Sequence, residues 1–575
     1  MLALFCGLNY AQNNNLDGIS EYTNFLDEVV VTDSRFLLKR SQSGKTVIKI
    51  KTEEIERFSG LGLGVLLSTH LGIDLIGKNM YSGQNLTFSI RGGRNRQVLI
   101  LIDGVRISDP SSIDNDFDIN SINIDMIQSI EIVKGATSSL YGSSAATGVV
   151  NITTKKPESS IALTFKKNWG IEQPSNQPLK KINAAYHLIN LTGTFSKIGI
   201  NLTLAERFSN GLSAVLGDEL DSFNKKNFSI GLNGKIIPKL SWRFTLNIDE
   251  ILADYDNKFP LEDADFQYFN KLNRLAINTK YDYEKGSLNL NLGFQQHNRD
   301  YKDSFLYNYS SENLNIDLFN KYIFNTNLYS IIGIQYQKSR MKAANDPMDN
   351  QTDIYMNSVY LHPSGLNINT GFRYNLHKVY GGHLIYSLNP SLSFDINQDH
   401  KLKLITSYSK AFISPSLFQL YDLSYGNINL EPEKNLSFEL GFEIIKIKNL
   451  FSALIFERNE NPTLIYDNSP KDGYPYGRYS NSENMIVYRG FELGYNFNIF
   501  HNVKTRSNYI YTETSNGDLR GIPNHTFSTI MDVSFTDFTN LNLISQYTGR
   551  RLANDNQTEL EAYSLFTFLL NHELE

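Results

Sequence analysis

The stretch GSLNLNLGFQQHN, Gly286 to Asn298, decides the expected fold of this 575-residue chain. Leucines occupy every second position, and asparagines lie between them. Because successive side chains of a β-strand point to opposite faces, one face is apolar and the other polar. The two sets are Leu288, Leu290, Leu292 and Phe294 on one face and Asn289, Asn291 and Gly293 on the other. The stretch therefore predicts a strand with one apolar and one polar face.

Segments with the same alternation recur from Pro157 to the C-terminus. Examples are KLSWRFTLNID, TNLYSIIGIQYQKSR, GLNINTGFRYN, HKLKLITSYSKAF, NLSFELGFEII and FTNLNLISQYTG. We count about twenty such segments, which is too many for one ordinary soluble β-sandwich. A soluble all-β protein is the alternative, and the strand count disfavours it.

The connections between these segments differ in length. Short turns (IPKL, YEKGS, NQDHK) contrast with three long polar connections, NGLSAVLGDELDSFNKKN, EILADYDNKFPLEDADFQYFNKLN and NENPTLIYDNSPKDGYPYGRYSNSENM. Short turns at one end and long loops at the other are typical of outer-membrane barrels. Residues 157–575 are therefore predicted to form a transmembrane β-barrel of about 20–22 antiparallel strands.

Composition argues against several other classes of protein. The net charge is −6, which gives no electrostatic reason to expect nucleic acid as a partner. No run of eighteen or more apolar residues occurs, so no membrane-spanning helix is predicted. A single cysteine, Cys6, excludes a disulfide within the chain. It lies in MLALFCGLNYAQ, and residues 1–11 read as a signal peptide that lacks its basic start; an exposed apolar tail is the alternative.

Residues 27–156 follow a different pattern. Thr52, Glu53 and Glu54 predict a helix start, and the glycines of GLGLG, residues 60–64, predict a break. Compact strands are expected in LTFSIRG, RQVLILIDGVRI, IQSIEIVKG and GVVNITTKK. Residues 36–156 are therefore predicted to form a small α+β domain.

Motifs for catalysis or cofactors are weak. GLGLG lacks the G-x-G-x-x-G spacing and the βαβ unit of a dinucleotide site, and RGGRNR is a single copy within predicted strands. Neither H-E-x-x-H nor G-x-S-x-G occurs. The chain gives no positive sign of an enzyme, and no cofactor is expected beyond the structural Ca²⁺ considered below.

Three motifs carry a family resemblance. DEVVVT resembles the TonB box, FSIRGGRNRQVLILIDGVRI the central plug strands, and IQSIEIVKGATSSLYGSSAATGVVNITTKK the C-terminal plug signature of TonB-dependent outer-membrane receptors. AFISPSLFQLYDLSYGNINLEPEKNLSFELGFE resembles a barrel motif of the same family. The resemblance implies a plug inside the barrel lumen and an outer-membrane location. The cobalamin receptors are the most similar subgroup, and siderophore receptors are close relatives.

The resemblance assigns the TonB box to a flexible N-terminal segment, residues 12–35. The box comprises Asp27, Glu28, Val29, Val30, Val31 and Thr32. It would pair with TonB, and so with the inner-membrane energy-coupling complex, by strand addition. An ordinary first plug strand is the alternative.

Three plug arginines, Arg91, Arg94 and Arg106, are expected within the lumen, where buried charges must be paired. We predict ion pairs with the barrel carboxylates Glu439, Glu443 and Glu492. The alternative is that the arginines are solvated, because a barrel lumen is wet.

Loop acids could bind calcium, which prefers carboxylate oxygens. The acids are Asp218, Asp221, Asp254, Asp256, Asp263 and Asp265. The resemblance favours structural Ca²⁺, since cobalamin receptors bind it through aspartates of their early outer loops. Solvated loop acids are the alternative.

Ligand contacts are expected at the plug apex and in the outer loops. The residues are Asn79, Met80, Tyr81, Ser82, Gln84 and Asn85 at the apex and Tyr425, Tyr474, Tyr476 and Tyr479 in the loops. Loop tyrosines suit recognition because they have an apolar body and a polar tip. Aromatic residues of the membrane interface are the alternative.

The C-terminus departs from the family. The chain ends YSLFTFLLNHELE, without the terminal aromatic residue that such receptors normally carry. We expect roughly two strands to be missing, because 22 are typical of these transporters.

The sequence therefore predicts TonB-dependent uptake of a bulky scarce solute, a cobalamin-like corrinoid or an iron chelate. A passive pore or an adhesin is the alternative. Outer-membrane lipids are expected partners, and a surface lipoprotein over the outer loops remains open.

Overall fold

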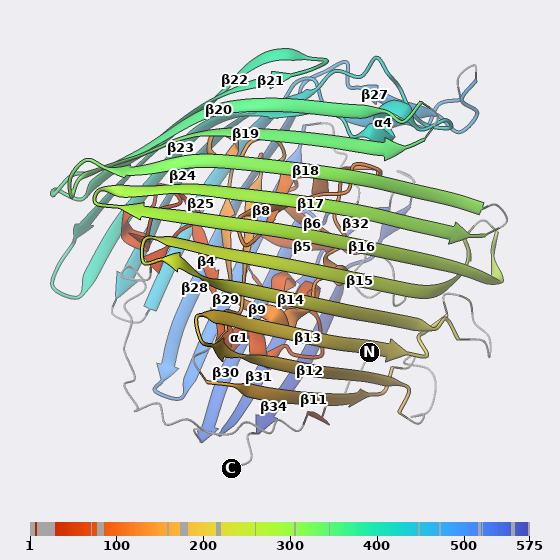
Figure 1. Cartoon of the computed structure of the whole chain (residues 1–575), viewed down its shortest axis with the longest axis horizontal. Coiled ribbons are helices and arrows are strands. Elements are labelled where there is room, and N and C mark those ends of the chain that lie inside the picture. Colours follow the sequence, from red (N-terminus) through yellow and green to blue (C-terminus); the bar gives the residue numbers. More distant parts are fainter. Residues whose placement is uncertain are drawn as a thin grey trace.

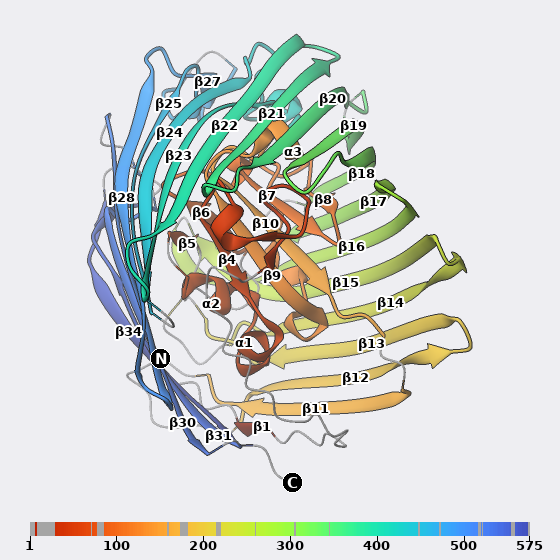
Figure 2. The same cartoon turned by 90° about the vertical axis from the view of Figure 1, so that its left-hand side faces the viewer.

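A large curved antiparallel sheet encloses a small N-terminal domain of strands and short helices (Figure 1, Figure 2). The computed structural model describes residues 6–7, 29–70, 72–76, 85–157, 160–172, 182–213, 215, 220–258, 260–303, 306–343, 345–446, 449–470, 473–515, 519, 521–536, 538–553 and 558–572. Figure 2 shows the N-terminal domain, coloured red and orange, within the curve of the larger sheet. This arrangement is the predicted plug inside a barrel.

The barrel sheet contains 21 strands within the described residues. In order across the sheet they are β1 (Cys6–Gly7), β11 (Ala162–Gly170), β12 (Ala184–Phe195), β13 (Ile198–Ser209), β14 (Phe223–Ile237), β15 (Leu240–Lys258), β16 (Leu261–Tyr283), β17 (Gly286–Lys302), β18 (Leu306–Ile323), β19 (Leu328–Lys342), β20 (Met348–Leu361), β21 (Leu366–His377), β22 (Gly381–Asp395), β23 (His400–Ile413), β24 (Glu433–Lys446), β25 (Asn449–Glu460), β28 (Ile486–Phe500), β29 (Val503–Thr514), β30 (His525–Thr536), β31 (Thr539–Thr548) and β34 (Tyr563–His572). Two short hairpins lie outside this sheet, β26 (Leu464–Asp467) with β27 (Arg478–Asn481) and β32 (Arg551–Leu552) with β33 (Glu559–Leu560). The prediction of about 20–22 antiparallel strands is confirmed.

Strand β21 shows the apolar outer face and polar inner face expected of a barrel strand. In β21, Phe372 and Leu376 are 53% and 45% exposed, whereas Arg373 and Asn375 are fully buried. The positions of the apolar and polar faces are the reverse of those in a soluble protein, because hydrocarbon surrounds a barrel and water or protein fills its lumen. In the described residues no helix is long and apolar enough to cross a membrane.

One predicted loop is wrong. The segment EILADYDNKFPLEDADFQYFNKLN, residues 250–273, was expected to be a long polar connection, but it extends β15 and β16 into a long hairpin. Its register runs from Leu240 opposite Tyr281 to Lys258 opposite Leu261, with a bulge after Tyr255. Backbone pairing of β15 with β16 continues beyond their pairing with β14 and β17, so side-chain polarity does not mark the ends of these strands.

The plug holds a five-stranded mixed sheet in the order β4-β9-β10-β7-β8. Its strands are β4 (Val47–Ile50), β7 (Val98–Ile102), β8 (Val105–Ile107), β9 (Ile127–Lys134) and β10 (Gly148–Thr154); β2 (Val29–Val30) pairs with β3 (Leu38–Lys39), and β5 (Ile73–Ile76) with β6 (Thr87–Ile90). Asp103 and Gly104 both have positive φ and form the tight β7–β8 turn.

Short helices complete the plug. They are α1 (Thr52–Arg57), α2 (Leu63–Ser68), α3 (Ser138–Tyr141) and the 3₁₀ turns η2 (Arg40–Gln42), η3 (Asn95–Gln97), η4 (Ile119–Ser121) and η5 (Ile124–Met126); α4 (Leu417–Tyr421) belongs to an outer loop. Glu53 and Glu54 in the first turn of α1 and Arg57 in its last turn complement the helix dipole. Ile55, Leu66 and Leu67 anchor α1 and α2 in the main apolar core against the sheet.

Candidate functional site

The N-terminal segment, Val29 to Arg35, is docked on the plug. Val29 pairs with Lys39 and Val30 with Leu38. Val30 is 1% exposed and packs against two residues of the plug sheet, Val47 and Val133. Burial of such a side chain contributes about 1.5–3 kcal/mol. The docked state is therefore stabilised by apolar packing as well as by hydrogen bonds.

Thr32 joins this segment to the plug through several hydrogen bonds. The carboxylate of Glu131, on β9, accepts hydrogen bonds from the backbone N–H groups of Val31 and Thr32 and from the Thr32 hydroxyl, at 2.9, 2.8 and 2.7 Å. The Tyr141 hydroxyl donates to the Thr32 carbonyl at 2.7 Å, and the Asn151 amide donates to the Thr32 hydroxyl at 3.0 Å. Thr32 is thus joined to two strands of the plug sheet and to α3.

Arg35 joins the segment to the barrel. Its guanidinium forms an ion pair with Asp317 of β18 at 2.8 Å and donates to the Tyr355 hydroxyl of β20 at 3.0 Å. It also lies over the Phe319 ring at 4.4 Å. The expectation of a flexible segment through residue 35 is therefore wrong for Val29–Arg35, because packing and ion pairing fix it. Asp27 and Glu28, the first two residues of the expected TonB box, lie outside the described residues.

A buried ion network joins the plug to the barrel near the middle of the lumen. Arg91 donates twice to Glu492, at 3.1 and 3.0 Å, and its guanidinium lies 3.0 Å from Glu439. Lys134 pairs with Glu492 at 2.6 Å, and Lys45 pairs with Glu439 at 3.1 Å. The five side chains are at most 3% exposed. Burial, followed by the charge of Arg91, lowers the pKa of Lys134 to about 8, against the opposing charge of Glu492.

The remaining predicted pairs are partly rearranged. Arg94 contacts Glu460 at 3.1 Å and Glu433 at 3.7 Å, neither of which was proposed. Glu443 pairs with Arg40 at 2.9 Å instead of with one of the three predicted arginines. Arg94 and Glu443 still find oppositely charged partners, as burial requires.

Arg106 was predicted to bind a barrel carboxylate, and this is wrong. Its guanidinium donates to the Ser143 carbonyl at 2.5 Å and to the Ser144 hydroxyl at 2.7 Å, both within the plug. Among the described residues it makes no ion pair, and burial lowers its pKa to about 10. The short β8 strand turns this side chain back over the plug loop, so uncharged oxygens satisfy it.

Several partners in these contacts were missed by sequence reasoning. They are Arg35, Arg40, Lys45, Arg96, Glu131, Lys134, Asp317, Glu433 and Glu460. Alternation could have found Glu433, which shares the odd-numbered face of β24 with Glu439 and Glu443. The plug cations had no such signal, because their partners come from distant parts of the chain.

The outer loops contact the apex of the plug through α4. Arg96 bridges Asp114 of the plug loop at 2.7 Å and Glu433 of the barrel at 2.6 Å. Gln419 of α4 donates to Asp114 at 3.2 Å, and the Ser416 hydroxyl donates to the Ile113 carbonyl at 3.1 Å. Movement of this outer loop is therefore linked directly to the plug apex.

The expected ligand-contact residues fall into three groups. Asn79, Met80, Tyr81, Ser82 and Gln84 lie outside the described residues; Asn85 donates to Asp116 at 3.4 Å. Tyr425 and Tyr479 belong to one aromatic cluster with Tyr466 and Phe418, over the plug apex. Tyr476 is 71% exposed, and Tyr474 stacks with Arg478 at 5.2 Å. The structure thus brings two of the four loop tyrosines together, and ligand contact by any of them stays a prediction.

Asp118 in the apical plug loop is expected to make plug stability depend on pH. It is buried and accepts hydrogen bonds from the N–H groups of Asn120 and Leu86. Burial raises its pKa to about 6, although these hydrogen bonds act in the opposite direction. Because the folded-state pKa exceeds the unfolded value of 3.8, its stabilising contribution is fully present below pH 3.8 and is lost as the pH rises through 6.

Asp118→Asn keeps an acceptor oxygen and removes the charge. We expect it to match the wild type at pH 4 and to be more stable by about 2–3 kcal/mol at pH 8, since one pKa unit is about 1.4 kcal/mol. Hydrogen exchange of the η4 amides at the two pH values measures this. Equal protection of the η4 amides in the wild type and in Asp118→Asn at pH 8 would contradict this prediction.

The acidic residues proposed for calcium do not gather in the described part of the chain, where no cluster of three His, Cys, Asp or Glu side chains has a metal-binding arrangement. Asp254 and Asp256 lie on β15 and accept hydrogen bonds from Ser222 and Ser213, respectively, while Asp263 and Asp265 are exposed on β16. Asp221 is buried, and Asp218 lies outside the described residues. Calcium binding stays a prediction, which calorimetric titration of the protein with Ca²⁺ would test.

Comparison with known proteins assigns both domains. Residues 183–574 match the family model described as TonB dependent receptor-like, beta-barrel, and residues 39–149 match the TonB-dependent Receptor Plug Domain. The vitamin B12 transporter BtuB of Vibrio cholerae is 28% identical over 426 residues, covering 72% of this chain and 67% of that protein. BtuB of Vibrio vulnificus is 24% identical over 584 residues, covering 94% and 88%.

Solved structures show the same fold at low identity. The siderophore receptor PirA from Acinetobacter baumannii has a TM-score of 0.78 at 16% identity and covers 92% of each chain. The ferric enterobactin receptor PfeA from Pseudomonas aeruginosa has a TM-score of 0.76 at 17% identity, also over 92% of each chain. The chain therefore belongs to the TonB-dependent receptors, a family of outer-membrane transport proteins that are not enzymes.

Proposed function

We propose that this receptor takes up a bulky corrinoid across the outer membrane, with energy supplied by TonB. TonB would add a strand to residues 27–32 and pull them toward the periplasm. The plug would then move far enough for the solute to pass. A corrinoid bound at the outer loops is the substrate, and release occurs on the periplasmic side.

The docking of the N-terminal segment is the observation that carries this proposal. Thr32 is hydrogen-bonded to Glu131, Asn151 and Tyr141, so force applied to the segment acts on the plug sheet and on α3. In turn, Arg373 of β21 donates to the carbonyls of Ser139 and Leu140 in α3. A passive pore or an adhesin has no need for a pulled segment bonded in this way.

Sequence similarity favours a corrinoid as the solute. The two relatives compared above are named as vitamin B12 transporters, and one of them aligns over nearly the whole chain. The solved siderophore receptors share the fold at 16–17% identity and carry no argument about ligand. An iron chelate is therefore the second candidate.

Binding to the purified receptor tests the ligand class. We expect cyanocobalamin to bind and ferric enterobactin not to bind in a parallel titration, with tryptophan and tyrosine fluorescence as the signal. Cells that depend on the receptor should also grow on limiting corrinoid. Binding of the iron chelate alone would replace the corrinoid with the second candidate, and binding of neither would refute both.

Arg35 and Asp317 are expected to hold the N-terminal segment in its docked state. Removing one partner of such a buried pair leaves the other charge unpaired, which costs about 3–5 kcal/mol. In a Cys6→Ser background that carries Val30→Cys as a buried reporter, Arg35→Ala should greatly accelerate thiol labelling. Asp317→Asn should do the same from the barrel side.

The double variant is the control for this pair. Because both changes remove one interaction, Arg35→Ala with Asp317→Asn should label little faster than either single variant. Leu37→Ala, at a neighbouring residue that is 79% exposed, should leave the labelling rate unchanged. Additive effects of the two changes would contradict a shared role.

A further inference from the structure

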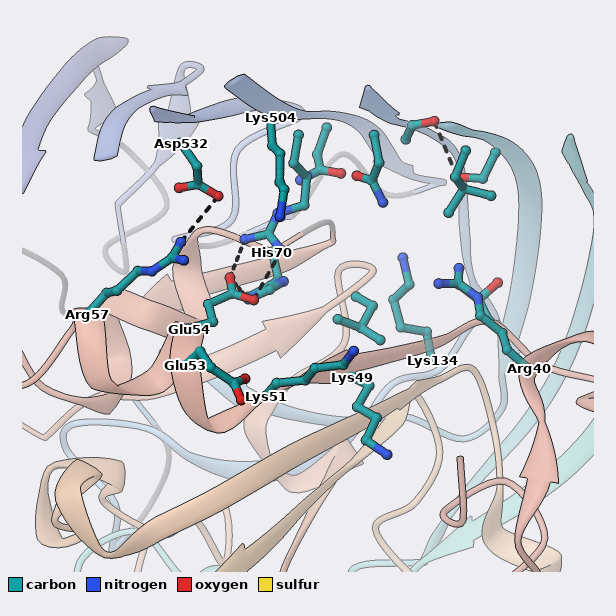
Figure 3. A pocket seen from close by; sticks show the side chains of 18 residues that line it. Arg40, Lys49, Lys51, Glu53, Glu54, Arg57, His70, Lys134, Lys504 and Asp532 are labelled. Atoms are coloured by element: carbon teal, nitrogen blue, oxygen red, sulfur yellow. Dashed lines mark hydrogen bonds and ion pairs between the residues drawn. The ribbon is translucent and has the colours of Figure 1, made fainter. Parts of the chain in front are cut away.

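A cavity of about 340 Å³ lies between the plug and the barrel wall. The plug side is formed by β4 and α1, and the barrel side by β25, β28, β29 and β30 (Figure 3). It lies near the short turn between β28 and β29, which is at the periplasmic end if the long loops face outward. The cavity is therefore close to the expected route of solute release.

Positive charge dominates the cavity lining. Within the described residues, seven Lys or Arg side chains and three carboxylates line it: Arg40, Lys49, Lys51, Arg57, Lys134, Lys504 and Arg506 against Glu53, Glu54 and Asp532. A cleft between low-dielectric walls concentrates the field of such charges. An anion entering the cavity would be attracted by the net positive charge of the lining.

Several of these cations already have acidic partners. Arg506 pairs with Glu54, Arg57 lies 3.5 Å from Asp532, and Lys134 pairs with Glu492 as described above. Arg40 pairs with Glu443, and Lys49 lies 3.7 Å from Glu131. These pairs order part of the cavity wall and offset much of its positive charge, whereas Lys51 and Lys504 are exposed.

Lys504 is different, because no acidic side chain of the described residues lies within ion-pair distance of it. Figure 3 shows it extending from β29 into the cavity, above His70 and Glu54. Lys51 and Lys134 enter the same space from the plug side. Because Lys134 is fully buried and paired with Glu492, an anion in the cavity would contact Lys504 from the barrel and Lys51 from the plug.

The titration of His70 agrees with an excess of positive charge. Burial and then the charge of Arg506 lower the pKa of His70, and Lys134 acts in the same direction, although Glu54 lies 3.4 Å away. His70 is therefore neutral at pH 7 and lies beside the cavity as a hydrogen-bonding group without adding charge.

We infer that this cavity is a binding site for an anionic group, a phosphate or a carboxylate, held between Lys504 of the barrel and Lys51 of the plug. Lysine ammonium groups bind phosphate as point charges. The anion is either part of the transported solute or a free periplasmic ion. The assignment of the anion to the transported solute rests on the proposed function, whereas the binding site itself does not.

Titration of the purified full-length receptor with inorganic phosphate tests the site. We expect calorimetry to detect binding that Lys504→Gln weakens about tenfold. Glu53→Gln removes a negative charge from the lining and should strengthen binding. Lys285→Gln, at an exposed lysine in the turn between β16 and β17, is the matched control and should have no effect.

Two results would overturn the inference. One is the absence of phosphate binding to the wild-type receptor. The other is equal affinity of the Lys504→Gln and Lys285→Gln variants. Lys504 makes no ion pair with the described residues, so its replacement should leave the barrel folded, which heat-modifiable gel mobility verifies.

Uptake measurements distinguish the two sources of the anion. If the solute supplies it, Lys504→Gln should slow uptake of labelled cyanocobalamin without changing its binding at the outer face. If a free ion supplies the anion, Lys504→Gln should weaken phosphate binding while uptake of labelled cyanocobalamin stays the same. Failure of the proposed function would instead appear as no cyanocobalamin binding at all, with phosphate binding intact.

Discussion

Val30→Pro should reduce uptake to the level of cells that lack TonB, while ligand binding at the cell surface remains normal. Proline has no backbone N–H and is excluded from paired strand interiors, so residues 27–32 could no longer form a continuous strand with a partner. Val30 is remote from the outer loops, which explains why binding should survive. Uptake of labelled ligand by energised cells, compared with surface binding in de-energised cells, measures both effects.

Val30→Thr is the matched control for this variant. Both substitutions disturb the apolar contacts that Val30 makes with Val47 and Val133 in the docked state. Threonine keeps the backbone N–H and favours extended structure, so strand addition to TonB remains available. We expect near-normal uptake by Val30→Thr. If Val30→Pro transported as fast as Val30→Thr, coupling through residues 27–32 would be refuted.

Glu492→Gln should destabilise the plug more strongly than Arg91→Met. After loss of Glu492, Glu439 is the one carboxylate of this network that remains to pair with three buried cations, Arg91, Lys134 and Lys45. Breaking a buried ion pair from one side costs about 3–5 kcal/mol. Loss of Arg91 leaves two balanced pairs, Lys134 with Glu492 and Lys45 with Glu439, so its cost should be smaller.

Hydrogen exchange of the amides of β7, an interior strand of the plug sheet, measures both costs. Glu457→Gln is the control, because Glu457 pairs with Arg489 on the exposed outer surface of the barrel and such pairs contribute at most about 1 kcal/mol. Greater loss of protection in Arg91→Met than in Glu492→Gln would contradict the charge-balance argument.

The barrel was the most predictable part of the structure. Alternation of apolar and polar side chains reflects a physical constraint on spanning strands, and β21 follows it residue by residue. The plug strands and the Asp103–Gly104 turn were also predictable, since short apolar runs ended by turn residues have few other conformations. The strands expected to be missing from the C-terminus are not tested by the described residues and stay a prediction.

The errors have a common physical origin. Residues 250–273 were assigned to a loop because they are polar, yet pairing of β15 with β16 needs only backbone groups. Arg106 was assigned to a barrel carboxylate because burial demands a partner, yet burial does not determine which partner. Glu131, which holds Thr32, could not be found from the sequence, since about one hundred residues separate the two.

The position of β4 determines how the plug would respond to a pull. Within the described residues, β4 is an edge strand of the plug sheet and pairs with β9 over four residues. The chain enters β4 beside Lys45, near the buried centre of the lumen, and leaves it toward the periplasmic cavity. Tension from the N-terminal side would therefore unzip the strand one hydrogen-bonded pair at a time instead of shearing all pairs together. Unzipping of this kind requires little force over a long extension. Because Thr46, Ile48 and Lys49 line the cavity, each pair that opens would widen it.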